Sequence, residues 1–320
     1  MMTNHNHPGS PHHLQVGGCH LISIPINNGV ADFIGKKGAE DSLVYYNRIY
    51  NDDTIVAISP ANLDDKFYGL AESITLSHII VIDAKSIDKQ LGEVLIATAL
   101  AGKPTIIIEH DTIDQSQLEG MLKQLNLPNY TTCKMEDILG KIASYKLDSN
   151  DASGQCRVDI DRSFNVKGAG TVVLGIVRKG SVKVHDKLLG KDSKEVIVRS
   201  IQSQDRDIQE AGVSTRVGLA LKGADSDEFK KGDTLSNYKI DPKKSITATI
   251  NVSSINKEDV KEKSSYIFVS GFSYTSATVS SFDGKSISLV FDKPLCIESS
   301  DSFMLIRKQE PRIFAFGKAD

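Results

Sequence analysis

The sequence predicts an α/β domain with a parallel sheet, followed by two antiparallel β domains, in a chain of 320 residues. Three observations support this fold class. Up to residue 145, short β-branched runs alternate with helical stretches, as strands and crossover helices do. Beyond that point, strand-like runs follow one another with Gly-containing turns. Two polar segments, Lys146–Gly154 and Lys239–Lys244, separate the three regions.

The first region contains five apolar runs of the kind found in buried parallel strands. These runs are Leu21–Ile26, Ile55–Ile58, His78–Asp83, Thr105–Ile108 and the weaker Tyr130–Cys133. Apolar residues spaced three and four apart predict the helices between them. The predicted helices are Leu63–Ser73, Lys89–Leu100, Leu118–Leu125 and Met135–Tyr145.

Composition is that of a globular protein, with 40% apolar and 25% charged residues. No run approaches the roughly eighteen apolar residues of a membrane span, and the N-terminus lacks the pattern of a secretory signal. Four cysteines without CxxC spacing suggest reduced thiols, so we expect a cytoplasmic protein with no membrane partner. Residues 1–19 are rich in His, Pro and Gly and predict a disordered tail that binds metal only adventitiously, so no metal site is expected.

Charge is divided unevenly along the chain. Residues 1–150 hold 11 Lys/Arg and 18 Asp/Glu, a net −7, whereas residues 151–320 hold 27 and 23, a net +4. A basic surplus favours an RNA partner for the second half, although many barrels carry as much positive charge.

The stretch Val158–Leu188 carries the most specific pattern in the chain. Its apolar runs Val172–Val177 and Val182–Val184, joined by Arg178-Lys179-Gly180, predict a β-hairpin. Gly168 and Gly170 precede the first run, and glycines at that spacing predict a structural turn.

This stretch resembles the second domain of translational GTPases, especially elongation factor Tu and the archaeal selenocysteine-specific factors. The likeness rests on Phe164, Val166, Gly168, Gly170–Val172, Gly175, Gly180 and Lys183–Asp186, and continues through Val196–Ile201, Thr215–Gly223 and Lys230–Leu235. After the tail at 1–19 that composition predicts, the resemblance implies a degenerate GTPase-like α/β domain at 20–148 and β-barrels at 155–238 and 245–320. Strand-like runs from Ser245 to Gly317, with a turn at Asp283-Gly284, resemble the family's third domain.

The nucleotide motifs of that family are degraded in this chain. A P-loop needs Gly-x-x-x-x-Gly-Lys-Ser/Thr to hold phosphates and magnesium. The first predicted strand is instead followed by a loop without lysine, whose relevant residues are Asn27, Asn28, Gly29, Ala31 and Asp32. The next motif has Ala61 and Asn62 where the family has glycine and histidine, and the guanine motif keeps only Asp111. The sequence thus predicts a degenerate P-loop-GTPase-like domain that needs no cofactor and binds GTP or GDP weakly.

The resemblance implies a role in translation, with tRNA or the ribosome as partner. The RNA-binding candidates are Arg162, Lys167, Arg178, Arg199, Arg216 and Lys222. No spacing suggests a catalytic constellation, and no DNA partner is expected. Two alternatives stay open: a working GTP-dependent elongation factor with an atypical site, and an adaptor whose α/β domain binds another protein.

Overall fold

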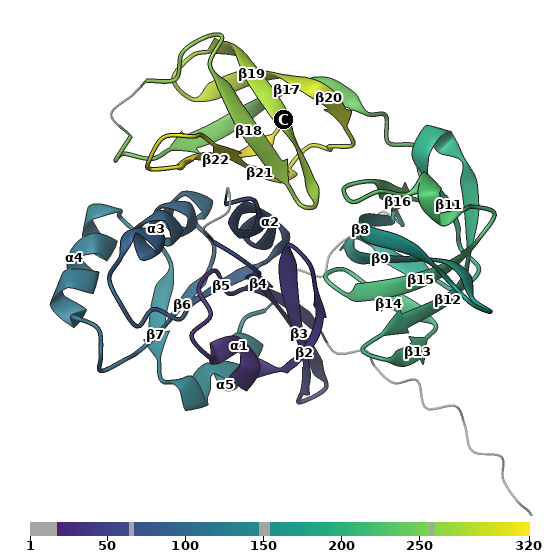
Figure 1. The fold of residues 1–320 in the computed structure, drawn as a ribbon, viewed down its shortest axis with the longest axis horizontal. Coiled ribbons are helices and arrows are strands. Elements are labelled where there is room, and N and C mark those ends of the chain that lie inside the picture. The colour runs from purple at the N-terminus through teal and green to yellow at the C-terminus, as the bar shows by residue number, and fades with distance from the viewer. Residues whose placement is uncertain (1–17, 64–66, 147–153, 257–258) are drawn as a thin grey trace, which may run out of the picture.

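The computed structural model describes residues 18–63, 67–146, 154–256 and 259–320. Nearly all of the predicted tail and most of the predicted linker Lys146–Gly154 lie outside these residues. Figure 1 shows an α/β domain, a β-barrel beside it and a second barrel lying across its helices. The predicted fold class is confirmed.

The first domain is a seven-stranded sheet in the order β2-β3-β4-β1-β5-β6-β7. Its strands are β1 (Cys19–Ser23), β2 (Lys36–Glu40), β3 (Leu43–Tyr50), β4 (Asp53–Pro60), β5 (Ile79–Ile82), β6 (Thr105–Ile108) and β7 (Tyr130–Cys133). Its helices are α1 (Val30–Ile34), α2 (Tyr68–Leu76), α3 (Lys89–Ala101), α4 (Gln115–Gln124) and α5 (Ile138–Ala143), the last preceded by a 3-10 turn at Met135–Asp137. Helices α2, α3 and α4 pack on one face of the sheet, and α1 and α5 on the other (Figure 1).

The sheet is mixed rather than parallel throughout. Five strands are parallel as predicted, but β2 and β3 extend the edge in antiparallel register, and neither strand was predicted. Strands β3 and β4 are joined by Asn51 and Asp52, both with positive φ (49° and 58°). Positive φ at both turn residues fits the twist of a two-residue β-hairpin. The Asn-Asp pair was therefore the sequence signal for this hairpin that the prediction missed.

The second domain is a barrel whose strands follow the order β11-β16-β8-β9-β15-β12, and pairing of β11 with β12 closes it. Strand β13 pairs with the outer part of β12, and β10 and β14 form a separate two-stranded sheet. Its strands are β8 (Arg157–Val166), β9 (Gly170–Lys179), β10 (Ser181–Lys183), β11 (Lys187–Leu189), β12 (Glu195–Ser203), β13 (Arg206–Ile208), β14 (Glu210–Gly212), β15 (Arg216–Lys222) and β16 (Thr234–Ser236). Short 3-10 turns occur at Lys191–Ser193 and Ser226–Glu228.

The predicted hairpin of Val172–Val177 with Val182–Val184 is wrong. Strand β9 pairs with β8 and β15, whereas β10 pairs with β14. The hairpin turn lies instead between β8 and β9, where Gly168 and Gly170 have φ of 88° and 79°. Left-handed backbone of this kind favours glycine, so the two glycines allow the turn.

The third domain is a closed barrel with the strand order β17-β20-β19-β18-β21-β22. Its strands are β17 (Lys243–Val252), β18 (Ser265–Ser270), β19 (Ser273–Phe282), β20 (Ser286–Leu295), β21 (Ser302–Ile306) and β22 (Ile313–Ala319). Val269, Met304 and Phe316 of this barrel belong to the same buried apolar cluster as Leu70 of α2 and Val94 of α3. The third domain therefore shares a core with the first, and burial of that core opposes their separation.

Candidate functional site

The loop after β1 lies where a nucleotide-binding α/β domain would hold phosphate, at the carboxyl edge of the parallel strands. Here the loop is held by its own side chains. The Oδ1 atom of Asn27 accepts hydrogen bonds from the backbone N–H groups of Gly29 (3.1 Å) and Ala31 (3.0 Å). Asp32, on α1, is exposed and adds negative charge beside the loop.

A buried carboxylate takes two more backbone donors of this loop. Asp83 follows β5, is fully buried, and its Oδ2 accepts from the N–H groups of Asn28 (2.7 Å) and Val30 (3.0 Å). The Asn28 side-chain amide also donates to the Asp83 carbonyl. An internal anion thus binds backbone N–H groups of the kind that a P-loop offers to phosphate.

Residues after β5 and β6 hold this carboxylate and the loop that it binds. The Nε2 atom of His110 lies 2.6 Å from Asp83 Oδ1, and Lys85 Nζ donates to the carbonyl of Asn28 at 2.8 Å. His110 stands in the degraded guanine motif, and the neighbouring Asp111 is exposed in a turn. Sequence reasoning missed Asp83 and His110, although Asp83 ends a predicted parallel strand, where functional groups gather.

Ala61 and Asn62 follow β4, which is parallel to β1, so they lie at the same edge as the loop. Both residues are exposed, and the Ala61 N–H donates to the Ser42 carbonyl at 3.0 Å. Alanine and the asparagine amide lack the acid–base capacity of a histidine ring.

Three of the six RNA-binding candidates lie against the first domain. Arg178 caps the end of α2: its Nη1 donates to the carbonyl of Leu76 at 2.9 Å, and its Nη2 to that of Thr75 at 3.5 Å. The Arg216 guanidinium lies 4.0 Å from the ring centroid of Tyr45 on β3, and Arg162 lies 3.7 Å from Asp41. These arginines join domains one and two.

The other three candidates, Lys167, Arg199 and Lys222, are exposed near the turn between β8 and β9. Arg199 Nη1 donates to the carbonyl of Ala169 in that turn at 3.3 Å. Phe164, near the end of β8, keeps 38% of its surface exposed. We call Phe164, Lys167, Arg199 and Lys222 the turn surface; it combines positive charge with an aromatic ring.

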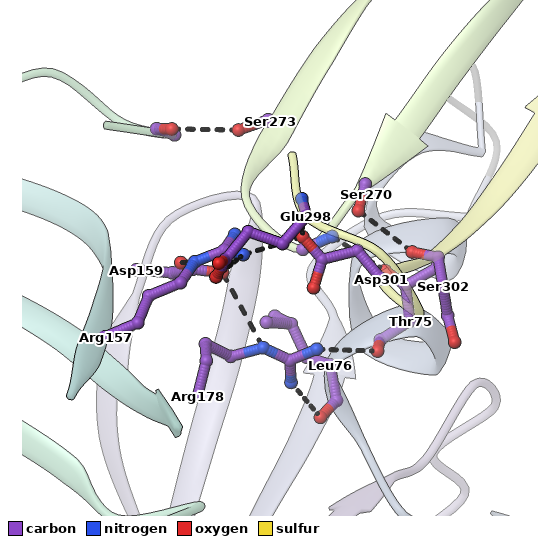
Figure 2. Close-up of polar contacts among 12 residues, drawn as sticks. Thr75, Leu76, Arg157, Asp159, Arg178, Ser270, Ser273, Glu298, Asp301 and Ser302 are labelled. Atoms are coloured by element: carbon purple, nitrogen blue, oxygen red, sulfur yellow. Dashed lines mark hydrogen bonds and ion pairs between the residues drawn. The ribbon is translucent and has the colours of Figure 1, made fainter. Parts of the chain in front are cut away.

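A polar junction at the meeting point of all three domains was not predicted. Figure 2 shows Arg157 and Arg178 of the first barrel converging on Asp159, with α2 of the first domain and Asp301 of the third beside them. Arg157 lies 2.7 Å from Asp159 and 2.6 Å from Asp301. Although burial opposes its charge, Asp159 and Asp301 raise the pKa of Arg157. Arg157 therefore stays charged and holds the two barrels together.

A second buried ion pair ties the first barrel to α2. Lys231 Nζ lies 2.8 Å from Glu72, whose side chain is 2% exposed, and also donates to Ser42. Burial raises the pKa of Glu72, and Lys231 opposes that shift. Losing one partner of a buried pair is costly, so these contacts favour one placement of α2.

Among the described residues, no three His, Cys, Asp or Glu side chains are grouped so that they could hold a metal ion. No helix in the same part of the chain has the length and apolar character needed to cross a membrane.

Comparison with known proteins gives the same architecture. A family model described as Elongation factor Tu domain 2 matches residues 170–236. An uncharacterized protein of Methanocaldococcus jannaschii is 30% identical over 295 residues, which covers 91% of this chain and 96% of that protein. The selenocysteine-specific elongation factor of the same organism is 33% identical over 190 residues, which covers 52% of this chain but only 40% of that factor.

Among solved structures, translation elongation factor SelB from Methanococcus maripaludis in its apo form matches with a TM-score of 0.76. The match covers 95% of this chain and 80% of that one at 19% identity. Identity that low shows a shared fold and does not transfer an activity.

Proposed function

This chain belongs to the SelB-like family of translation elongation factors, and from that premise we propose that it binds tRNA or the ribosome with little or no GTP hydrolysis. The location implied is the cytoplasm. The proposal treats the first domain as a pseudo-GTPase that keeps the fold of a nucleotide-binding domain.

The observation that carries this proposal is the Asp83 carboxylate on the loop after β1. A phosphate on the same N–H groups would lie within a few ångströms of that buried charge. Two like charges at 4 Å repel by about 4 kcal/mol at an effective dielectric of about 20. That repulsion weakens binding about a thousandfold.

The absent P-loop lysine and the Ala61-Asn62 pair support the same reading. Phosphoryl transfer depends on positioned cations and an oriented water molecule. The described loop offers neither a lysine nor a hydroxyl at the spacing of a P-loop, so GTP hydrolysis should not exceed the background rate.

The turn surface supports the RNA part of the proposal. Its lysines and arginine can neutralise phosphates, and the exposed Phe164 ring offers a face for an unstacked base. The other predicted arginines are held against the first domain, so RNA binding should depend on Lys167, Arg199 and Lys222 more than on Arg178.

The test measures GTP affinity, GTP turnover and tRNA binding with one purified preparation. Binding to bulk tRNA should weaken steeply as the salt concentration rises. The double substitution Lys167→Ala and Lys222→Ala should also weaken it. The control Lys285→Ala, which removes an exposed lysine of the third barrel, should leave tRNA affinity unchanged. Magnesium-dependent turnover that Asn28→Asp abolishes would establish a working GTPase instead. Absence of tRNA binding even at low salt would favour the protein adaptor.

A further inference from the structure

The turn between β18 and β19 has a buried tip. Ser270 pairs with Ser273 across this hairpin, so Gly271 and Phe272 form the tip. Connecting turns usually lie at the protein surface, yet Phe272 is only 1% exposed. The third barrel therefore inserts this turn into the rest of the molecule.

The Phe272 ring lies in an apolar cluster that the other two domains build. The cluster includes Tyr45 of β3, Leu76 at the end of α2 and Ile176 of β9 in the first barrel. Among the described residues, the third barrel's own core is a separate cluster around Phe268 of β18. Burial of the Phe272 ring thus stabilises the contact between domains rather than the barrel that carries it.

Hydrogen bonds fix the turn to both neighbouring domains. The backbone N–H of Gly271 donates to the buried Thr75 hydroxyl of α2 at 3.1 Å. On the other side, Ser273 Oγ donates to the Gly232 carbonyl of the first barrel at 2.8 Å, as Figure 2 shows. A Cβ atom on Gly232 would lie 2.9 Å from Ser273 Oγ, so the two segments approach this closely only with glycine there.

The lysine that pairs with α2 also lies over the Phe272 ring. Lys231 Nζ is 5.7 Å from the ring centroid and 2.8 Å from the buried Glu72 carboxylate. A cation within about 6 Å of a ring centroid is attracted to the ring face. Withdrawing the ring would also let water reach the ion pair, and charges attract less strongly in water than in a dry interior.

We propose that the β18–β19 turn is a conformational lock that holds the first domain on both barrels. The first domain can rotate against the barrels only if Phe272 leaves its cluster and Gly271 releases Thr75. A ligand shifts such an equilibrium only by its differential affinity for the two arrangements, so it would have to supply the free energy of that withdrawal. The lock does not depend on the translation role, because it uses no residue of the turn surface or of the loop after β1.

Cys19 is a native reporter for this contact. Its thiol is buried in the same apolar cluster as Phe272 and donates from Sγ to the Ser214 carbonyl of the first barrel at 3.1 Å. Cys156 lies instead within the first barrel's own core, where it stays buried when the domains separate. A thiol reagent should therefore reach Cys19, and not Cys156, when the first domain leaves the barrels.

The experiment measures the labelling rate of each thiol in the full chain. Truncating a buried ring shifts an opening equilibrium by about a hundredfold or more, so Phe272→Ala should label Cys19 faster by that factor. Phe272→Leu keeps an apolar side chain in the cluster and should stay within about tenfold of the wild type. The matched control is Phe268→Leu in the third barrel's own core, which should leave the Cys19 rate unchanged. Cys156 should label at one rate in all four proteins.

Three results would overturn the proposal. The first is an unchanged Cys19 rate in Phe272→Ala. The second is an acceleration at Cys19 that Cys156 or the Phe268→Leu control shares, because the substitution would then act through general unfolding. The third is equal acceleration in Phe272→Ala and Phe272→Leu, because burial of apolar surface would then not hold the turn.

Discussion

Replacing Asp83 by alanine should destabilise the first domain and convert its loop into a site for an external anion. The carboxylate is fully buried and accepts two backbone N–H groups at 2.7 and 3.0 Å, while His110 lies 2.6 Å away. Asp83→Ala leaves the Val30 donor buried without its partner.

The expected magnitude follows from these contacts. A hydrogen bond to a charged group contributes about 1.5–3 kcal/mol, and breaking a buried charged arrangement costs about 3–5 kcal/mol. We therefore expect Asp83→Ala to lower the free energy of unfolding of the first domain by about 3–5 kcal/mol. Phosphate or sulfate at ten times its dissociation constant should restore about 1.4 kcal/mol.

The measurement combines urea unfolding with hydrogen exchange of the loop amides, since three domains do not guarantee a two-state transition. The matched control is Asp88→Ala. Asp88 Oδ1 caps α3 by accepting from the Leu91 N–H at 2.9 Å, so its loss should cost about 1 kcal/mol with no response to anions.

The reasoning fails if Asp83→Ala is no less stable than Asp88→Ala. It fails equally if phosphate protects the wild type as much as the variant, because the anion would then act elsewhere.

Three further predictions concern the domain junctions. Arg178→Met should cost about 1.5–3 kcal/mol, because the α2 carbonyl of Leu76 loses its charged donor; an unchanged calorimetric profile would contradict this. Burial, with the positive charges of Arg178 and Lys318 nearby, lowers the pKa of Lys103 to about 7. Between that pH and the ordinary lysine pKa, the unfolded chain therefore binds more protons than the folded chain. Relative to Lys103→Met, the wild type should therefore gain stability as pH rises from about 7 to about 9, and a difference independent of pH would refute this. GTP and GDP should leave the radius of gyration equal in small-angle scattering; a change with GTP alone would mean that a nucleotide switch survives.

Much of the fold could be predicted because its strands have local signatures. Thr105–Ile108 and Tyr130–Cys133 have the same bounds as β6 and β7, since β-branched runs ending in turns define both. The prediction missed β2 and β3, and it paired Val172–Val177 with the wrong strand. Pairing depends on which edge is free in the folded sheet, and neighbouring residues do not encode that.

By itself, the sequence determined the family likeness, the order of the three domains and the loss of the nucleotide motifs, because each depends on residue types at short spacing. Only the tertiary structure decided which side chains hold the loop after β1 and the domain junctions. Asp83 reaches Asn28 across 55 residues, and Arg178 reaches Leu76 across 102. A carboxylate or a guanidinium acquires a partner only when the chain brings distant segments together, and burial then makes that partner obligatory.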